Sequence, residues 1–592
     1  MAALIDSTPT CLARTAARLP DHPAYFVRDA QGWQPTAWSA LWAQVQQAAR
    51  ALVALGVQGG QTVCILGFNR PEWLVMAHAT AGAGARVAGI YWTSAAGEVQ
   101  YIVAHSQCAL LLVEDAAQAA KLAGTRAALP GLRHVVAMEG PAIEGVMAWR
   151  DFMARGAPPA LQDEVDACLA ALDPQATSTL IYTSGTTGPP KAVMLSHANL
   201  AWAAQALAAA TTRSEHDRHI SYLPLAHVAE MVGSIHAPAR MGSAIYFARN
   251  LESLPEHLKE VRPTVFFGVP RVWEKMHAAL SLRLGAATGV KGALARWSMH
   301  VARRWHVADL AGQRPGPGLA LQRALARRLV LRKVQAALGL DQAHLLLSGA
   351  APIAAEKLHF FCGLDLVVRE LYGQSEIGGP TTFSLAGSTR IGAVGKPVPG
   401  LELRIADDGE ILVRGPGLFQ GYAGEPEATA ATLVHGWLHS GDLGHLDADG
   451  YLFITGRKKD LLITSGGKNI SPANLESALM ALPLVEHAVV VGDGRHYLSA
   501  LLTLRAEALA EFTQRQGLPL EGAARHEAVQ AELQRGIDAV NAQQARVAGI
   551  RKFAVLEQPL GIATGELTAT MKVRRAAVIR AHAAVVEAMY RD

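Results

Sequence analysis

The stretch STLIYTSG, residues 178–185, has the pattern of a buried β-strand that ends in a loop. Leucine, isoleucine, tyrosine and threonine fill the run, and serine and glycine end it. HLLLSGAAP at 344–352 and DLVVRELYG at 365–373 repeat this plan. Helical stretches separate such strands along most of the chain, so we predict α/β layers with mostly parallel sheets. Ligands gather beyond the carboxyl ends of such strands, and these three loops therefore form the predicted binding cleft.

The pattern of the sequence changes near Gly400. GLELRIADDGEILVRG, residues 400–415, predicts two strands joined by an Asp-Gly turn, and hence an antiparallel hairpin. A charged link, RKKD at 457–460, then precedes ISPANLESAL, in which Ser471 is the predicted helix N-cap and Pro472 the first helical residue. We therefore place the main domain boundary at the charged link.

Length and composition support two globular domains. At 592 residues the chain exceeds the usual size of one core, half of its residues are apolar, and 18% are charged. We predict a large N-terminal domain, residues 1–456, with layered, mostly parallel sheets, helices and a β-rich subdomain. A small mobile α+β domain is predicted at residues 457–592.

Charge and cysteine content exclude several classes of protein. A net charge of +4 is too weak to predict a nucleic-acid partner. The five cysteines lie far apart without a CxxC pair, which is typical of reduced thiols in a cytosolic protein. The first 20 residues lack the apolar core of a signal peptide, and charge interrupts every long apolar stretch, so no membrane-spanning helix is predicted. We expect a cytoplasmic protein, with peripheral contact to the inner face of the membrane as an open alternative.

The loop after the first strand has the chemistry of an anion-binding site. YTSGTTGPPKAVMLSH, residues 182–197, combines glycines that allow close backbone approach with hydroxyl donors and one ammonium: Gly185, Gly188, Ser184, Thr186, Thr187 and Lys191. It is not a Walker loop, because Lys191 follows Pro190 and no Gly-Lys-Ser/Thr occurs in the chain. An ordinary glycine-threonine loop between a strand and a helix is the alternative.

This loop resembles the phosphate loop of the AMP-forming adenylating superfamily, which includes acyl-CoA synthetases, luciferases and peptide-synthetase adenylation domains. Further motifs follow in the order of that family, over about residues 20–580: SYLPLAHVAE at 221–230, SGAAP at 348–352, LYGQSE at 371–376, SGDLG at 440–444, TGRKKDLLITSGGKNISP at 455–472 and ELTATMKVRR at 566–575. PTVFFGVPRVWEKM at 263–276 and the long segment after it resemble the long-chain fatty acyl-CoA synthetase branch.

The resemblance implies how ATP is bound. The phosphates would be held by Thr183, Ser184, Gly185, Thr186, Thr187, Gly188 and Lys191, with Thr186 also at a magnesium ion. The adenine would lie against Gly349, Ala350, Ala351, Tyr372, Gly373, Gln374 and Ser375, with Tyr372 stacked on it. Asp442 would accept both ribose hydroxyls, and Arg457 would reinforce them from across the domain boundary. Core packing of Tyr372 and a surface ion pair of Asp442 with Arg457 are the alternatives.

Glu376 is the predicted magnesium ligand, because it follows a glycine-containing turn after a buried strand and hard cations take carboxylate oxygen. Its alternative role is that of a carboxylate at a helix N-terminus, stabilised by the helix dipole. The neighbouring Ser375 and the phosphate loop favour the metal role.

Three residues are assigned to catalysis. In the first half-reaction a carboxylate attacks the α-phosphorus of ATP, and the ammonium of Lys572 would stabilise the charge that builds on the phosphates. A solvated basic run with Arg574 and Arg575 is the alternative for Lys572. His227 would line the acyl-carboxylate site, although a lone histidine there is more often a core residue. Lys459 would be the hinge about which the small domain rotates.

The rotation would withdraw Lys572 and open a channel for the pantetheine arm of coenzyme A. Gly466 would let that arm pass close to the backbone, and Lys468 resembles the phosphate-binding basic position of the family. Two positions depart from the family pattern: Ala192 replaces a glycine and Ala569 replaces a proline. No aromatic gate follows His227, so tunnel gating is not carried over.

Residues 281–340 hold eleven Lys/Arg against one acid, Asp309, and apolar residues interleave at helical spacing. This basic helical insertion is compatible with a solvated basic face and also with a helix lying on an anionic bilayer, and both interpretations stay open. The function expected overall is that of an ATP-dependent fatty acyl-CoA synthetase that uses magnesium and forms an acyl-adenylate. A ligase delivering its acyl group to a carrier protein and an inactive membrane-associated scaffold are the alternatives, and a homodimer is the assembly considered. No carrier domain follows Lys572, which favours free coenzyme A as the acceptor.

Overall fold

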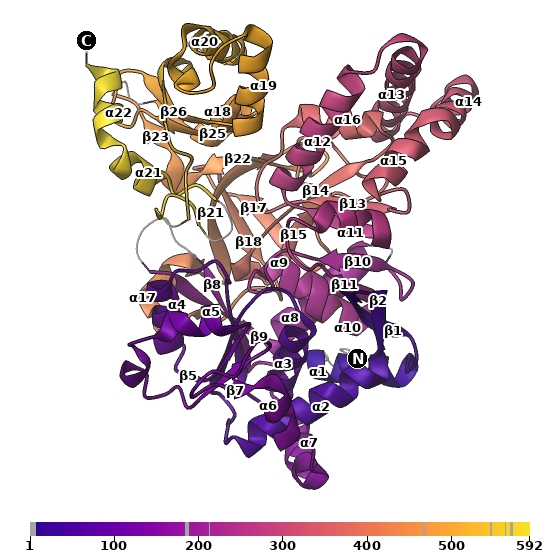
Figure 1. Cartoon of the computed structure of the whole chain (residues 1–592), viewed down its shortest axis with the longest axis vertical. Helices are drawn as coiled ribbons and strands as arrows, with labels where there is room; N and C mark the ends of the chain where they lie inside the picture. Colours follow the sequence, from indigo (N-terminus) through magenta and orange to yellow (C-terminus); the bar gives the residue numbers. More distant parts are fainter. Residues whose placement is uncertain are drawn as a thin grey trace.

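The computed structural model describes residues 7–183, 189–211, 213–465, 468–544, 548–562, 564–568 and 572–591. A large N-terminal part contains four main sheets, and a smaller C-terminal part lies beside it at one end of the molecule (Figure 1). Parallel strand pairs run through the largest sheet and helices pack against it, so the predicted α/β class is confirmed.

The largest sheet has eight strands in the order β19-β9-β8-β4-β3-β5-β6-β7. Its strands are β3 (Thr62–Leu66), β4 (Arg86–Ile90), β5 (Cys108–Val113), β6 (His134–Ala137), β7 (Met147–Ala148), β8 (Thr177–Thr183), β9 (Lys191–Ser196) and β19 (Gly421–Tyr422). The middle strands pair in parallel, and β3 and β5 are buried along their whole length because both faces of the sheet are covered.

The strand β9 runs antiparallel to β8, with Lys191 opposite Thr183. The predicted phosphate loop is therefore followed by a strand, and the helix α8 (His197–Ala210) comes only after it. A Ser196–Asn199 capping box starts that helix. Of the predicted phosphate-binding residues, Ser184, Gly185, Thr186, Thr187 and Gly188 lie outside the described part of the chain.

The second sheet has the order β12-β13-β14-β15-β16. Its strands are β12 (Val265–Gly268), β13 (Leu345–Ser348), β14 (Val368–Gln374), β15 (Gly379–Phe383) and β16 (Lys396–Pro397). The strands predicted in HLLLSGAAP and DLVVRELYG are confirmed as β13 and β14. Because β12, β13 and β14 are parallel, their carboxyl ends meet at one edge of the sheet, where the adenine loops were predicted.

Two further sheets complete the N-terminal part. One comprises β10 (Arg218–Ser221), β11 (Ala244–Phe247), β1 (Pro23–Asp29) and β2 (Gly32–Ala37). The other comprises β17 (Glu402–Ile405), β18 (Glu410–Arg414), β20 (Leu433–Val434), β21 (Trp437–Leu446) and β22 (Leu452–Arg457). The predicted Asp-Gly hairpin is confirmed, since β17 and β18 are antiparallel and Gly409 has a φ of +84° in the turn.

The C-terminal part follows the short 3-10 turn η7 (Lys458–Asp460). It contains β23 (Leu462–Ile463), β24 (Asn469–Ile470), and a sheet of β25 (Val485–Val491), β26 (Leu498–Leu504) and β27 (Ile550–Val555). Its helices are α18 (Pro472–Met480), α19 (Ala506–Gln516), α20 (Glu527–Asn541), α21 (Arg575–Ala581) and α22 (Ala583–Tyr590). Ser471 and Pro472 occupy the predicted N-cap and first helical positions of α18.

Five helical segments form the predicted basic insertion and its flanks: α12 (Pro270–Gly285), α13 (Gly289–Leu310), α14 (Pro317–Ala326), the π-turn η5 (Arg327–Leu331) and α15 (Arg332–Leu338). The helices α13 and α14 project away from the sheets at the upper right of Figure 1. No helix in the described ranges is long and apolar enough to cross a bilayer.

Candidate active site

A buried carboxylate organises the centre of the site. Asp442 on β21 faces Arg457 on β22 in the strand register, and Arg457 Nε lies 2.8 Å from Asp442 Oδ1. The hydroxyl of Tyr372 donates to Asp442 Oδ2 at 2.8 Å, and the amide of Gln374 donates to the same oxygen and to the carbonyl of Ser440. The side chain of Asp442 is only 5% exposed and that of Arg457 is 58% exposed, so a buried carboxylate meets a guanidinium at the surface, on neighbouring strands and not on a turn. Four residues predicted to bind one nucleoside therefore meet at one point.

Tyr372 lies on β14, next to a bulge at which β14 approaches β15 very closely. A Cβ on Gly373 would lie 2.3 Å from the carbonyl oxygen of Gly379, so only glycine is accommodated at this bulge. Tyr372 is 7% exposed. Burial and the Asp442 carboxylate raise the pKa of Tyr372, so its phenol stays protonated and donates.

The loop after β13 lies against β14. A Cβ on Gly349 would be 2.8 Å from the side chain of Leu371, and Ala350 adopts a left-handed φ of +68°. Such a conformation is unusual for alanine and is held by its surroundings. Gly349 thus lies against Leu371, the residue before Tyr372, at the edge of the sheet where the adenine loops were predicted.

Lys572 reaches this centre from the far end of the chain. Its backbone is fixed by Thr568, whose N–H donates to Lys572 O at 2.8 Å and whose Oγ1 accepts from Lys572 N at 3.0 Å. The Lys572 residue is exposed by its surface area, although many protein atoms lie around its side chain. Burial and the guanidinium of Arg457 lower the pKa of Lys572 to about 8, and Asp442 partly opposes this shift. Lys572 therefore lies within electrostatic reach of both residues.

His227 is the N-cap of the short helix α9 (Val228–Met231). Its Nδ1 accepts a hydrogen bond from the N–H of Ala229 at 3.2 Å, which places the ring proton on Nε2. Burial, reinforced by the ammonium of Lys572, lowers the pKa of His227 to about 3. The imidazole is therefore neutral near pH 7 and offers a hydrogen bond rather than a charge.

A second group of side chains surrounds the lysine of the phosphate loop. Lys191 Nζ lies 3.1 Å from Glu425 Oε2 and 5.0 Å from the centre of the Tyr422 ring. The hydroxyl of Tyr422 donates to Glu376 Oε1 at 2.8 Å. Thus Tyr422 contacts both the predicted phosphate-binding lysine and the predicted metal ligand.

Sequence reasoning missed Tyr422 and Glu425. The two-residue strand β19 brings Tyr422 beside β9, where Tyr422 pairs with Val193. So short a strand has no periodic pattern of its own. The available signal was weak: a tyrosine after a glycine, followed within three positions by a carboxylate, in GYAGEP.

The donor set around Glu376 fits magnesium bound together with a nucleotide. Glu376 lies on the 3-10 turn η6 (Ser375–Ile377), and Tyr422 occupies one of its carboxylate oxygens. No group of three or more His, Cys, Asp or Glu side chains suited to a metal occurs within the described ranges. Magnesium commonly uses one or two carboxylates plus phosphate oxygens and water, which a lone Glu376 satisfies. The other predicted metal contact, Thr186, lies outside the described residues.

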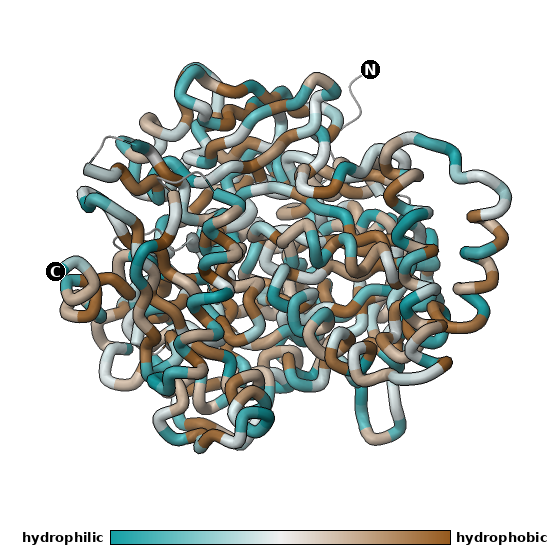
Figure 2. The backbone as a smooth tube through the Cα atoms, turned by 90° about the horizontal axis from the view of Figure 1, so that it is seen from above, coloured by the Kyte–Doolittle hydropathy of each residue, from teal (hydrophilic) through white to brown (hydrophobic). Residues whose placement is uncertain are grey.

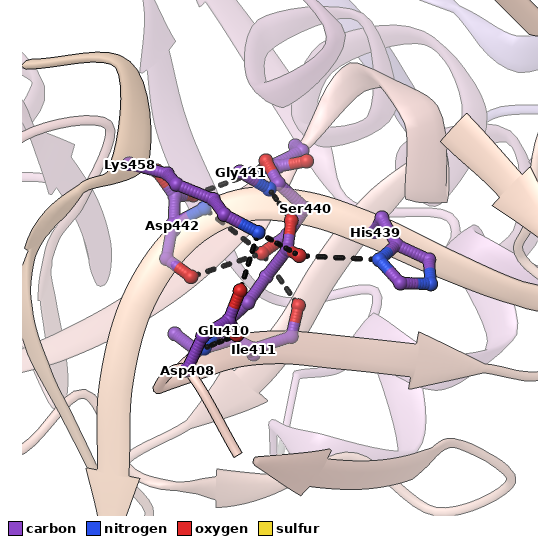
Figure 3. A network of polar contacts seen from close by, with 9 residues as sticks. Asp408, Glu410, Ile411, His439, Ser440, Gly441, Asp442 and Lys458 are labelled. Atoms are coloured by element: carbon purple, nitrogen blue, oxygen red, sulfur yellow. Dashed lines mark hydrogen bonds and ion pairs between the residues drawn. The ribbon is translucent and has the colours of Figure 1, made fainter. Parts of the chain in front are cut away.

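The predicted hinge adjoins a compact ionic network (Figure 3). Glu410 accepts from the N–H of Gly441 at 2.9 Å and pairs with Lys458 and His439, each at 3.1 Å. Burial alone would raise the pKa of Glu410, but these hydrogen bonds lower it. Lys458 also pairs with Asp408 at 2.6 Å. The base that pairs with the carboxylates of the sheet is therefore Lys458, and both Lys458 and the predicted hinge residue Lys459 are exposed.

The predicted coenzyme A loop is described only in part. Gly466 lies outside the described residues. Lys468 is exposed and closes a turn, since its carbonyl accepts from Thr464 N at 3.1 Å. Nothing in this arrangement brings Lys468 to the Asp442 centre.

Comparison with known proteins identifies the family. Residues 12–423 match the AMP-binding enzyme family, and residues 459–592 match the AMP-binding enzyme C-terminal domain. The long-chain-fatty-acid–CoA ligase FadD15 of Mycobacterium bovis is 38% identical over 558 residues, covering 92% of this chain and 91% of that protein. The long-chain-fatty-acid–CoA ligase ACSBG2 of Xenopus laevis is 34% identical over 609 residues, covering 97% and 82%.

Solved structures show the same fold. The anthranilate CoA ligase AuaEII in complex with anthranoyl-AMP has a TM-score of 0.74 at 21% identity, covering 99% of both chains. The adenylation domain of a carboxylate reductase from Mycobacterium chelonae has a TM-score of 0.76 at 20% identity, covering 100% of this chain and 92% of that one. On the matched residues and the identity to these relatives, this chain belongs to the AMP-binding enzyme family.

Proposed function

We propose that the protein is an ATP-dependent fatty acyl-CoA synthetase acting on long-chain acids. A fatty acid and ATP give an acyl-adenylate and pyrophosphate, and coenzyme A then displaces AMP to give the acyl-CoA. The names of the relatives that align over most of the chain support this reaction. The observation that supports it is that Lys572 lies within electrostatic reach of Asp442 and Arg457, although it comes from a distant part of the chain.

In the first half-reaction Asp442 and Arg457 bind the ribose, and the loop at 348–351 with Tyr372 lies against the adenine. Lys191, together with the loop at 183–188, binds the phosphates. The ammonium of Lys572 stabilises the negative charge that builds as the acid oxygen attacks the α-phosphorus and pyrophosphate leaves. His227, neutral and protonated on Nε2, donates a hydrogen bond to the acid group.

Glu376, with Thr186, would hold the magnesium ion. Bound there, magnesium neutralises phosphate charge during the transfer. Tyr422 orients the Glu376 carboxylate through its hydroxyl and supports Lys191 with its ring. The two groups that meet the phosphates are thus positioned by one side chain.

The second half-reaction requires Lys572 to move away from the nucleotide site. We assign the domain boundary to the charged link, with residues 1–456 as the large domain and 457–592 as the mobile one. Rotation about Lys459 would withdraw Lys572, admit the pantetheine arm past Gly466, and bring Lys468 to a phosphate of coenzyme A. The ion pair between Arg271 on α12 and Glu486 on β25 joins the two parts in the present arrangement and would break on rotation.

The cysteines support a reducing compartment. All five are free thiols, and four of them are buried. We therefore place the protein in the cytoplasm.

A product screen tests the function. Purified protein is incubated with ATP, magnesium, coenzyme A and acids of graded chain length, and AMP, pyrophosphate and thioester are measured together. Thioester formed in equal amount to AMP from long-chain acids is the expected result. Pyrophosphate exchange without thioester would instead identify a ligase that feeds a carrier protein, and absence of AMP with every acid would identify an inactive scaffold. Light scattering on the same sample distinguishes a monomer from the homodimer considered.

A further inference from the structure

Charge is distributed very unevenly along this chain. Residues 281–340 contain eleven Lys/Arg and one acid, a net charge of +10. The remaining residues contain 43 bases and 49 acids, a net charge of −6. A weakly basic protein therefore consists of a mildly acidic body and one strongly basic segment. Such asymmetry is typical of proteins that contact an anionic surface.

The basic segment forms a helical hairpin with an apolar seam. The helices α13 and α14 pack through buried Val301, Ala302, Ala326 and Leu331, with Trp297 and Leu319 partly buried against them. This seam already covers the inward faces of the two helices. The outward faces are therefore left to interact with something other than the rest of this chain.

Those outward faces carry leucines where a solvated helix would carry polar groups. Leu321, Leu325 and Leu329 lie four residues apart and are 75%, 48% and 38% exposed. Six of the eleven exposed large hydrophobic residues in the described ranges belong to this segment: Leu282, Val290, Val307, Leu321, Leu325 and Leu329. Figure 2 shows hydrophobic and hydrophilic positions alternating along the helix at the right-hand edge.

Cations line the same face. Arg328, Arg332 and Lys333 are exposed on η5 and α15, immediately after the leucine positions. Within the described part of the chain none of the three lies within 4.0 Å of a carboxylate. Their charge is thus not neutralised by the protein itself. We define the docking face as Leu321, Leu325, Leu329, Arg328, Arg332 and Lys333.

The hairpin is held firmly to the body of the protein. Asp365, which is 2% exposed and has a φ of +62° in the loop before β14, receives His306 from α13 at 2.7 Å, Arg323 from α14 at 2.8 Å and Arg327 from η5 at 3.0 Å. One buried carboxylate therefore clamps three helical segments in a fixed orientation. An orientation fixed in this way presents the leucines and the free cations as a single surface.

We propose that this docking face binds an anionic lipid bilayer, with the leucines inserted among the acyl chains and the bases at the headgroups. Arg and Lys side chains reach from an interfacial helix to lipid phosphates while apolar residues lie below them. A protein partner would need matching carboxylates and a closed apolar contact, and a second copy of this hairpin would place +10 against +10. The bilayer alone matches both the apolar stripe and the charge.

The inference deepens the proposed function. The reason for docking rests on a fatty acid being the substrate, whereas the test of docking does not. Long-chain acids partition into bilayers, and a docked enzyme would take them from there. Vesicle binding is measured without ATP, coenzyme A or acid. Failure to bind vesicles would therefore leave the synthetase activity untouched, and failure of the activity would leave the binding result intact.

The test is flotation of the full chain with vesicles of phosphatidylcholine, with and without phosphatidylglycerol. We expect flotation with the anionic vesicles at low salt, weakening with added salt. The triple variant R328E/R332E/K333E should lower the partition coefficient at least about 100-fold, at about fivefold per neutralised charge. L321S/L325S/L329S should lower it about tenfold or more while leaving the salt dependence in place.

Matched controls lie elsewhere on the surface. R150E/R525E/R535E changes the net charge by the same amount at three exposed arginines, and L251S/L446S/L520S removes three exposed leucines. Both controls should float as the parent chain does. Absence of flotation of the parent chain, or equal loss in controls and docking-face variants, overturns the proposal. A change of oligomeric state in the docking-face variants, with vesicle binding unchanged, would overturn it in favour of a contact between copies.

Discussion

Asp442 and Arg457 face each other across neighbouring strands, with 2.8 Å between Asp442 Oδ1 and Arg457 Nε. The pair lies within electrostatic reach of Lys572, and its two members act on that ammonium in opposite directions. Arg457 lowers the pKa of Lys572, and Asp442 raises it. An ammonium with a pKa of about 8 is still mostly charged at pH 7 and loses its proton just above that pH, so the balance of the pair sets the pH at which the charge is lost.

The first prediction concerns the pH dependence of adenylation. If the charged form of Lys572 is required, kcat/KM for pyrophosphate release should fall as pH rises through about 8, because this profile reports the free enzyme. With an unperturbed lysine, kcat/KM would not fall until about pH 10.4. His227, with a pKa of about 3, should add no acidic limb near pH 6.5. A profile that stays flat to pH 10 would contradict the assignment.

The second prediction concerns the Asp442–Arg457 pair. Asp442→Asn removes the charge that favours the ammonium, so the alkaline limb should move below pH 8. Arg457→Gln removes the charge that opposes it, so the limb should move above pH 8. Both variants should also weaken ATP binding, by about tenfold or more, since each loses a charge-assisted contact. Arg150→Gln, on the distant helix α6 (Trp149–Arg155), is the control and should leave the limb in place. Shifts of equal sign in the two variants would show that the pair does not act on Lys572.

The third prediction concerns Tyr422. Burial and Glu376 raise the pKa of Tyr422, so it donates to that carboxylate at all working pH values. Tyr422→Phe keeps the ring under Lys191 and removes the donor. A hydrogen bond to a charged group contributes about 1.5–3 kcal/mol. The magnesium concentration for half-maximal activity should therefore rise by about tenfold or more. Tyr25→Phe, at a tyrosine that donates to Gln44, should have no such effect.

A direct binding measurement separates positioning from loss of structure. Manganese binding to the protein–ATP complex should weaken in Tyr422→Phe, while ATP binding without a divalent ion should match that of the parent chain. Equal weakening of both would mean that the hydroxyl acts on the fold of the site and not on the Glu376 carboxylate.

The fold class and the contributing loops could be predicted because they depend on local patterns. The strands that end at Thr183, Ser348 and Gln374 are short β-rich runs followed by glycine or serine. The hairpin at Gly409 follows from the turn chemistry of Asp-Gly. Such features need no information from elsewhere in the chain.

The connections between distant residues could not be predicted in the same way. The contact of Tyr422 with Glu376 arises from a two-residue strand, and the clamp at Asp365 joins three helices to one loop. The strand β9, which follows the predicted phosphate loop, was not among the predicted strands. Lys572 could be assigned only through the family resemblance, because nothing local distinguishes it from a solvated basic run.

The fourth prediction concerns the contact between the two parts of the molecule. Arg271 and Glu486 form an ion pair that we assign to the adenylate-forming arrangement. Their side chains are 34% and 26% exposed, and such partly exposed pairs contribute about 1 kcal/mol or less. Arg271→Ala or Glu486→Ala should therefore slow adenylate formation up to about fivefold and leave thioester formation from added acyl-adenylate unchanged. The charge swap R271E/E486R should restore the rate, and equal slowing of both half-reactions would contradict the assignment.

The most direct test of the account is single-turnover kinetics of Lys572→Ala, with the two half-reactions measured separately. Formation of acyl-adenylate and pyrophosphate should slow by about 10²–10³-fold. Conversion of added acyl-adenylate and coenzyme A to thioester should proceed at the rate of the parent chain, and the thermal unfolding midpoint should stay unchanged. Adenylate formation at the parental rate in this variant would contradict the convergence of Lys572 with Asp442 and Arg457 on one ATP.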